Sequence, residues 1–276
     1  MPAPVLVGIV NITEDSFSDG GRFLDHAAAT AQAHRLIADG ADVIELGAAA
    51  SNISSATVTA SQEIARLAPV IDALAAKNIP LSVDTCQGET QRFAILRGID
   101  YLNDITGFPD AGLYPALATA PCRLVVMHMV ERGARAQRVD LDAETVWRGV
   151  DGFFAERLSQ LENAGIARER LILDPGMGFF LSSRAEASVS VLAGIGRLKS
   201  RFGLPVMISV SRKSFLGALT GRTKPGELNG ATLAAELYAA AQGVDMIRTH
   251  DPGALRDALL VTQALAQAGD YSAATR

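Results

Sequence analysis

The chain consists of short apolar runs separated by longer stretches in which apolar residues recur every three or four positions. Apolar runs without a strict apolar–polar alternation are typical of strands that are buried on both faces, as in parallel sheets. Eight such runs are present, and they occupy residues 5–10, 42–47, 79–84, 99–103, 123–127, 171–174, 204–210 and 244–248. The pattern therefore predicts eight parallel strands.

The longer stretches predict helices between these strands. Apolar residues recur at helical spacing from Ile64 to Ala75, and Thr59 and Gln62 just before them have the spacing of a capping box. A second apolar stripe runs through residues 146–161 and predicts a helix that packs on the core. Several of the runs follow a glycine or an asparagine, the residues that most readily end a helix in the left-handed conformation.

The spacing of the strands distinguishes two folds. The predicted strand ends lie between residues 11 and 249, at intervals that average about 34 residues. A barrel of eight strand–helix units needs about 250 residues in all, roughly 31 per unit. We therefore predict an α/β fold, a single (β/α)8 TIM barrel that takes up residues 1–276 as one domain. A doubly wound open sheet is the second choice, because the chain has no glycine-rich dinucleotide fingerprint.

Composition narrows the class of protein further. Hydrophobic residues make up 49% and charged residues 20%, as in a globular chain, and the net charge of −5 argues against nucleic acid or a membrane surface as a partner. No apolar run approaches the ~18 residues of a membrane span, and the first residues do not resemble a signal peptide. Cys86 and Cys122 are predicted to be reduced thiols, which favours a cytoplasmic protein.

Polar residues stand at the end of every predicted strand, where the active site of a TIM barrel lies. Carboxylate and amide groups end three of the strands, and they suit a planar heterocycle with N–H donors, such as a pterin or a purine. Basic residues end the last two strands, where this fold commonly binds phosphate. The first group comprises Asp84, Asn103 and Asp174, and the second comprises Lys213, Arg248 and His250. Asn11 ends the first strand and could share Mg²⁺ with a diphosphate, because Mg²⁺ takes few protein ligands.

Six segments resemble the signatures of the dihydropteroate synthase family, in the family's order and spacing. They extend over nearly the whole chain, from Gly8 to about Gly253. The matching segments are residues 10–21, 82–85, 102–105, 174–179, 211–214 and 248–250.

The resemblance implies an enzyme of folate synthesis and a set of functional residues. The family condenses 6-hydroxymethyl-7,8-dihydropterin diphosphate with p-aminobenzoate, with Mg²⁺, and gives 7,8-dihydropteroate and diphosphate. By motif position, the pterin would be held by Asp84, Asn103, Ile105, Met127, Asp174 and Lys213. The diphosphate would be held by Asn11, Arg248 and His250, with Asn11 also toward the metal, and the catalytic set would be Asp84, Lys213, Arg248 and His250. Barrels of this family are often homodimers, so the resemblance also implies a homodimer.

The chain departs from the usual family pattern around the expected p-aminobenzoate pocket. Ser51 and Asn52 replace the usual Thr and Arg, and Phe180 stands where the family usually has a small residue before a lysine. The resulting segments resemble those of acquired, sulfonamide-insensitive synthases, so we predict insensitivity to sulfonamides. The residues assigned to this pocket are Ser51, Asn52, Phe179, Phe180, Ser211 and Lys213.

Two other functions fit part of the pattern. A corrinoid-dependent methyltetrahydrofolate methyltransferase has a related pterin-binding barrel, but it has no use for an anion site made by Lys213, Arg248 and His250. A non-catalytic pterin-binding barrel would not need the complete cluster of basic residues either. Release of diphosphate on addition of p-aminobenzoate separates the synthase from both.

Overall fold

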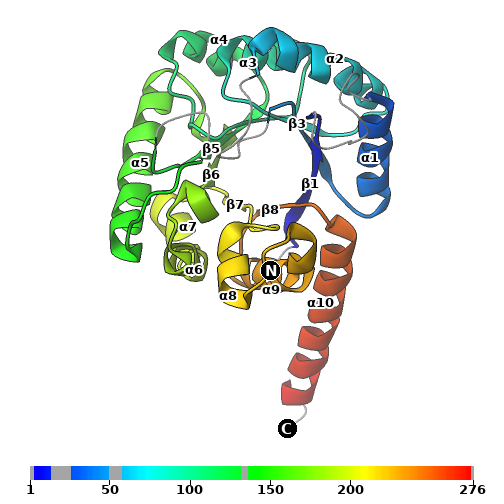
Figure 1. Ribbon diagram of the computed structural model, residues 1–276, viewed down its shortest axis with the longest axis vertical. Helices are drawn as coiled ribbons and strands as arrows, with labels where there is room; N and C mark the ends of the chain where they lie inside the picture. The colour runs from blue at the N-terminus through cyan, green and yellow to red at the C-terminus, as the bar shows by residue number, and fades with distance from the viewer. Residues whose placement is uncertain (1–2, 14–25, 50–57, 132–135, 275–276) are drawn as a thin grey trace.

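The eight strands form one parallel sheet that curves into a barrel surrounded by helices (Figure 1). The structure is a computed structural model, and it describes residues 3–13, 26–49, 58–131 and 136–274. The strand order is β6-β5-β4-β3-β2-β1-β8-β7. A parallel bridge between Leu173 and Val206, with a backbone hydrogen bond of 2.9 Å from the Leu173 N–H to the Pro205 carbonyl, joins the two outer strands and closes the ring. The predicted TIM barrel is therefore confirmed.

The elements alternate in the order expected from the sequence. The strands are β1 (Val5–Asn11), β2 (Val43–Gly47), β3 (Leu81–Asp84), β4 (Tyr101–Asp104), β5 (Arg123–Met127), β6 (Leu171–Asp174), β7 (Met207–Ile208) and β8 (Met246–Thr249). The α-helices are α1 (His26–Ala38), α2 (Ala60–Ala75), α3 (Gly88–Leu96), α4 (Tyr114–Thr119), α5 (Ala143–Asn163), α6 (Ala185–Ala193), α7 (Gly196–Phe202), α8 (Ser214–Thr220), α9 (Asn229–Ala241) and α10 (Pro252–Ala274). Four short 3-10 turns lie between them: η1 (Ala111–Leu113), η2 (Arg168–Arg170), η3 (Gly178–Phe180) and η4 (Pro225–Leu228).

Local sequence accounts for the start of α2 and the packing of α5. Thr59 accepts a hydrogen bond from the Gln62 N–H, and the Gln62 side chain accepts one from the Thr59 N–H, so the predicted capping box is present. In α5 the predicted apolar stripe faces the core, because Val150, Phe154 and Leu161 are all fully buried.

β7 is much shorter than the sequence pattern predicts. The apolar run covers residues 204–210, but only Met207 and Ile208 are in the strand. Pro205 has no N–H to donate to a ladder, and Arg212 takes a left-handed conformation with φ of 59°, so the chain turns away soon after the strand ends.

The side chains inside the barrel change from apolar to polar along the strand direction. Alternate residues of a strand point to the same side. One inward-facing layer is apolar and consists of Val7, Val43, Val125, Ile172, Met207 and Met246. Two residues further along their strands stand Glu45, Asp174 and Arg248. The polar site therefore rests on an apolar layer and faces the carboxyl ends of the strands.

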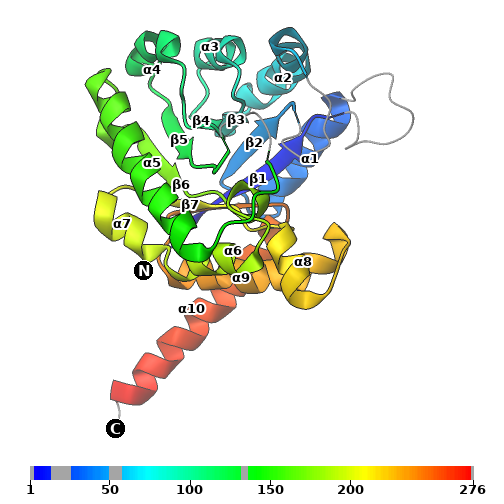
Figure 2. The ribbon, with the colours of Figure 1, turned by 60° about the vertical axis from the view of Figure 1, so that its left-hand side comes forward.

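α10 extends well beyond the barrel in both ribbon views (Figures 1 and 2). Its first turns pack on the barrel, where Arg256 donates hydrogen bonds to the Gly40 carbonyl and the Asp42 carboxylate. Further along, Leu260, Val261 and Leu265 are exposed. Among the described residues, no helix has the length and apolar character that a membrane span requires.

Candidate active site

Glu45 and Arg248 form the centre of a buried charged network inside the barrel. Glu45 comes from β2 and is 1% exposed, and its Oε1 forms an ion pair with the Nε of Arg248 from β8. The Nη2 of the same guanidinium donates to Asp84 Oδ2 at the end of β3, over 2.9 Å. Arg248 is therefore held between two carboxylates from different strands, an arrangement that suits its fork of donors.

A second residue of β3 and one residue of β4 join this network through Glu45. The second carboxylate oxygen, Oε2, accepts hydrogen bonds from the Ser82 hydroxyl at 2.9 Å and from Asn103 Nδ2 at 3.3 Å. Asn103 is 1% exposed, and its Oδ1 is buried without a hydrogen-bond partner among the described residues. Glu45 lies within the run 42–47 that predicts a strand, but the sequence pattern did not assign it to the site. Glu45 lies two residues after Val43 of the inward-facing apolar layer, so it also faces the interior of the barrel. This alternation could have identified it.

Two aspartates of the site are less acidic than usual. Burial raises the pKa of Asp84 to about 7, and although Arg248 opposes this rise, the nearby Glu45 adds to it. Burial also raises the pKa of Asp174 to about 6, even though its Oδ1 accepts a hydrogen bond of 2.8 Å from the Gly176 N–H. Both groups can therefore accept hydrogen bonds near neutral pH and can also hold a proton.

Lys213 brings a second cation to the same region. Burial lowers the pKa of its ammonium to about 8, Arg248 lowers it further, and Asp174 and Asp84 oppose the change. The Lys213 Nζ lies 4.7 Å from the centroid of the Phe180 ring. This distance is that of a cation–π contact, so Lys213 connects the carboxylates with the aromatic part of the site.

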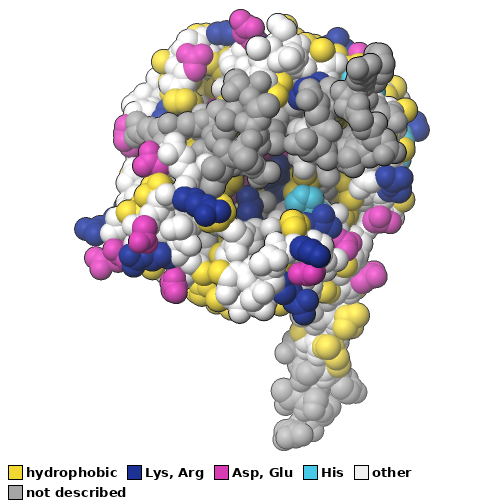
Figure 3. Space-filling view, in the orientation of Figure 1, with side chains coloured by type: hydrophobic (Ala, Val, Ile, Leu, Met, Phe, Trp, Pro, Cys, Tyr) yellow, Lys and Arg dark blue, Asp and Glu magenta, His cyan; other side chains and the backbone are white. Residues whose placement is uncertain are grey.

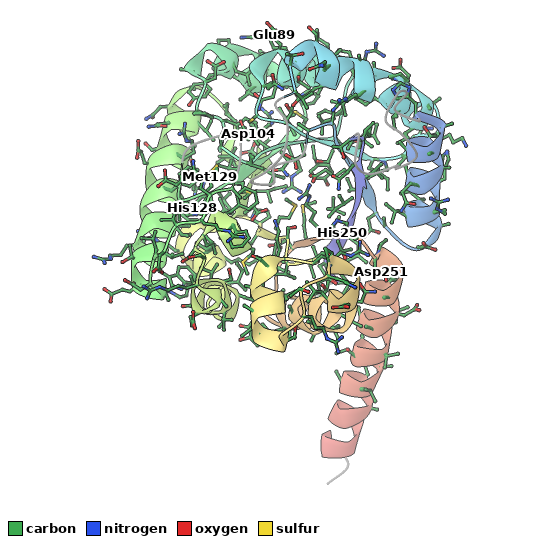
Figure 4. All side chains as sticks on the ribbon, viewed as in Figure 1. Glu89, Asp104, His128, Met129, His250 and Asp251 are labelled. Carbon is green, nitrogen blue, oxygen red and sulfur yellow. The ribbon has the colours of Figure 1, made fainter. Side chains whose placement is uncertain are left out.

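His250 lies on the β8 side of the barrel mouth (Figure 4). Its Nδ1 is 2.9 Å from the Ser211 hydroxyl, which also accepts a hydrogen bond from the His250 N–H at 3.3 Å. Burial, Arg212 and Arg248 lower the pKa of His250 to about 3, so the ring is neutral in the unliganded protein. The expected basic cluster therefore holds two cations, and His250 is available as a hydrogen-bonding group. Figure 3 shows a histidine and basic side chains around the central hollow.

An apolar cluster forms the opposite wall of the mouth. Ile105, Met127 and Phe180 pack together with Met129 and Ala136, and Phe179 and Cys86 lie against them. Ile105 and Met127 were expected to contact the pterin, and Phe179 and Phe180 were assigned to the p-aminobenzoate pocket. All four therefore lie in one apolar wall.

A cavity of about 670 Å³ opens beside this wall. Its volume lies within the range of small-molecule sites. Phe179, Phe180 and Lys213 line it, together with the arginines Arg138 and Arg212. Ser211 was assigned to the same pocket, but it is not among the lining residues and instead contacts His250.

The remaining predicted residues lie at or beyond the edge of this set. Asn11 is exposed at the end of β1, beside Gly47 of β2. Ser51 and Asn52 lie outside the described residues. Asp104 and His128, also at strand ends, hold loops: Asp104 accepts from the Thr106 and Phe108 N–H groups, and His128 Nδ1 lies 3.1 Å from the Pro175 carbonyl.

The donor set is compatible with Mg²⁺ only if the substrate supplies most of the ligands. Among the described residues, no group of three or more His, Cys, Asp or Glu side chains could hold a metal ion. Asn11 offers one amide oxygen at the barrel mouth, and Mg²⁺ commonly binds through few protein oxygens plus substrate phosphate and water.

Comparison with known proteins identifies the family. The model of the family described as "Pterin binding enzyme" matches residues 7–250. Dihydropteroate synthase type-2 of Escherichia coli is 57% identical over 261 residues, which cover 95% of this chain and 96% of that protein. The chain belongs to the dihydropteroate synthase family. It is thus an enzyme of the transferase class, and type-3 synthase of Escherichia coli is 50% identical over 94% of this chain and 98% of its own length.

Solved structures of the family agree with the fold. The Xanthomonas albilineans synthase with 4-aminobenzoic acid is 38% identical, with a TM-score of 0.87, over 96% of this chain and 93% of that one. The same enzyme in complex with 7,8-dihydropteroate gives a TM-score of 0.84 at 38% identity, over 96% of this chain and 94% of that one.

Proposed function

We propose that this enzyme condenses 6-hydroxymethyl-7,8-dihydropterin diphosphate with p-aminobenzoate to give 7,8-dihydropteroate and diphosphate, and that it is insensitive to sulfonamides. The observation that carries the reaction is the meeting of Asp84, Asn103 and Asp174 with Arg248 and Lys213 at the open end of the barrel. Acceptors for a heterocycle and cations for an anion lie side by side there. The ligands named for the solved relatives fit this arrangement, since 4-aminobenzoic acid is the second substrate of the proposed reaction and 7,8-dihydropteroate is its product.

The charges of the site suit departure of the diphosphate before attack of the amine. Arg248 and Lys213 would stabilise the negative charge that grows on the leaving group. Asp84 and Asp174, which we expect to hold the heterocycle, would stabilise the positive charge left on it. An aniline nitrogen attacks in its neutral form, so the site needs no strong base.

Asn11 and the substrate would hold Mg²⁺ at the barrel mouth. When bound, the metal would help neutralise the diphosphate. His250, neutral in the unliganded protein, would donate a hydrogen bond to the same anion, whose negative charge would raise the pKa of the ring.

The second half of the proposal, insensitivity to sulfonamides, rests on the aromatic wall. p-Aminobenzoate ends in a planar carboxylate, whereas a sulfonamide ends in a tetrahedral sulfonyl group that carries a further substituent. Phe180 lines the cavity and is held by its own packing, since it is only 7% exposed. A fixed ring at this point can reject the bulkier group and tolerate the smaller one.

One assay tests the reaction. The purified protein is given the pterin diphosphate, p-aminobenzoate and Mg²⁺, and dihydropteroate and diphosphate are measured together. We expect both products in equal amounts, and at least tenfold slower turnover in Arg248→Ala and in Lys213→Ala. A methyltransferase or a non-catalytic barrel would release no diphosphate on addition of p-aminobenzoate. A sulfonamide titration of the same assay tests insensitivity.

The quaternary state and the location in the cell are part of the same proposal. We expect a homodimer in the cytoplasm. The exposed Leu260, Val261 and Leu265 on α10 support self-association, because apolar patches on a free surface are unfavourable. Sedimentation equilibrium should give a mass of twice 29.0 kDa. A single species of 29.0 kDa at micromolar concentration would contradict the dimer.

A further inference from the structure

We propose that Glu45 is a positioning residue that determines the hydrogen-bonding polarity of Asn103, so that Asn103 presents an acceptor to an N–H group of the bound heterocycle. The inference rests on the proposed function, since it concerns how the site holds the pterin. Glu45 touches no substrate atom in this scheme. It acts through Asn103 and Arg248.

The contacts of Glu45 determine which way the Asn103 amide faces. An ionised carboxylate only accepts hydrogen bonds. Since Asn103 lies 3.3 Å from Glu45 Oε2, the group that faces the carboxylate must be the donor Nδ2. The inverted amide would bring two acceptors together at the same distance. Glu45 therefore turns Asn103 Oδ1 away from itself.

The outward-facing oxygen is free to accept a hydrogen bond as far as the described residues are concerned. Asn103 Oδ1 is buried and accepts no hydrogen bond from any described residue. A buried acceptor without a partner is costly, and a ligand that brings a donor removes the cost. An N–H or amino group of the heterocycle is such a donor. Asp84 and Asp174, whose oxygens also accept, extend the same acceptor surface.

Arg248 fixes the orientation that a glutamine at position 45 would adopt. The Arg248 Nε donates to Oε1 of residue 45, so in Glu45→Gln the amide oxygen must stay on that side. The new Nε2 then faces Asn103 and forces its amide to invert. Asn103 would present a donor to a donor on the ligand. We expect the KM for the pterin diphosphate to rise at least tenfold, with the KM for p-aminobenzoate within twofold of the parent.

An exchange of the two side-chain types provides the decisive test. In the double variant Glu45→Gln with Asn103→Asp, the glutamine donates to one oxygen of the introduced carboxylate, and the second oxygen of that carboxylate again accepts from the ligand. Asn103→Asp alone places two carboxylates against each other and should be as poor as Glu45→Gln. We expect the double variant to recover at least fivefold of the lost kcat/KM for the pterin diphosphate. Glu144→Gln, the same substitution at an exposed position in the first turn of α5, is the matched control, and its KM for the pterin diphosphate should stay within twofold of the parent.

The outcomes separate this inference from the proposed function. If the parent forms no dihydropteroate, the proposed function fails. If the parent is active and Glu45→Gln keeps the parental KM, the inference fails alone. A folded double variant no better than Glu45→Gln also overturns it. Should thermal denaturation show that Glu45→Gln does not fold, a double variant no better than Asn103→Asp overturns it in the same way.

Discussion

The pKa values of the residues at the carboxyl ends of the strands depend on their surroundings as well as on the type of side chain. Three carboxylates, Glu45, Asp84 and Asp174, meet two cations, Arg248 and Lys213, in a region from which water is largely excluded. Burial in this region raises the pKa values of Asp84 and Asp174 and lowers that of Lys213, while the opposite charges nearby act against each of these shifts. A heterocycle rich in N–H donors would bind to the carboxylates, and an anionic leaving group would bind to the two cations.

Asp84 offers the first test at this scale. Asp84→Asn replaces an acceptor with a donor and removes one of the two carboxylates that hold Arg248. We expect at least a tenfold higher KM for the pterin diphosphate and less than a twofold change for p-aminobenzoate. Steady-state kinetics measure both. Asp72→Asn, which removes an exposed partner of Arg97, is the control and should match the parent. Unchanged kinetics in Asp84→Asn would remove Asp84 from the site.

Lys213 offers a test by pH. Because its pKa is about 8, the parent should lose kcat/KM for the pterin diphosphate as the pH rises through 8 and the ammonium loses its proton. Lys213→Arg keeps a positive charge at every accessible pH, so its profile should stay level up to pH 9, at a lower rate. Lys199→Arg, an exposed substitution beside Asp245, should keep the parental profile. A parent with a level profile to pH 9 would contradict the assignment.

The residues of the site lie at or near the carboxyl ends of the strands. β2, β3, β4 and β8 all contribute to one network, although Glu45 and Arg248 are 203 positions apart in the chain. The turns after the strands complete the site: η3 brings Phe179 and Phe180 to the cavity that the start of α8 also lines. Outside the barrel, α9 supports β8 through a buried acid, Glu236, whose side chain hydrogen-bonds to Thr249.

The η3 turn carries the prediction on sulfonamides. We expect Phe180→Gly to lower the sulfonamide concentration for half inhibition at least tenfold, with less than a threefold change in the KM for p-aminobenzoate. Loss of a buried phenylalanine costs about 3–5 kcal/mol, so Phe180→Leu, which keeps more of the packing, is measured alongside with the melting temperature of each. If both folded variants stay as insensitive as the parent, the clash lies elsewhere, and Ser51 and Asn52 become the candidates.

α9 carries a prediction on stability. Burial raises the pKa of Glu236 from 4.5 to about 7, and its Oε1 has no partner among the described residues. The folded protein therefore binds this proton more tightly than the unfolded chain, and the resulting stability, complete below pH 4.5, is lost as the pH rises through 7. Glu236→Gln does not titrate, so its free energy of unfolding should gain roughly 2–3 kcal/mol on the parent between about pH 4.5 and pH 8.

Urea unfolding at several pH values measures this difference. Glu227→Gln, at an exposed position of η4, is the control and should follow the parent across the range. A difference between Glu236→Gln and the parent that does not vary with pH would show that Glu236 has the same pKa in the folded protein as in the unfolded chain, and would contradict the prediction.

The whole molecule places the site by closing the ring of strands. β7 contributes only two residues, and the contact between Leu173 and Val206 completes the closure. The inward-facing layer near the amino ends of the strands is apolar and fills that end of the barrel. The charged layer above it therefore faces the mouth. Ligands therefore enter from the carboxyl ends of the strands, past His250 (Figure 4) and past the cavity that Phe180 lines.

Periodic and local features could be predicted from the sequence because they depend on neighbouring residues. The strands, the capping box of Thr59 and Gln62, and the core stripe of α5 follow from alternation, spacing and side-chain chemistry. The polar strand ends could be predicted for the same reason, since the barrel fold fixes where all carboxyl ends of its strands lie.

Only the tertiary structure decided how these residues combine. Glu45 joins the site because β2 lies beside β3 and β1 lies between β2 and β8, which brings it to Arg248, and no local pattern contains that pairing. His250 is neutral because burial and two nearby arginines act on it together. Ser211 contacts His250, 39 positions further along the chain, because β7 and β8 are neighbours in the sheet. The sequence by itself determined which chemical groups stand at the carboxyl ends of the strands, whereas their charges, partners and orientations depend on distances across the barrel that only the closed sheet creates.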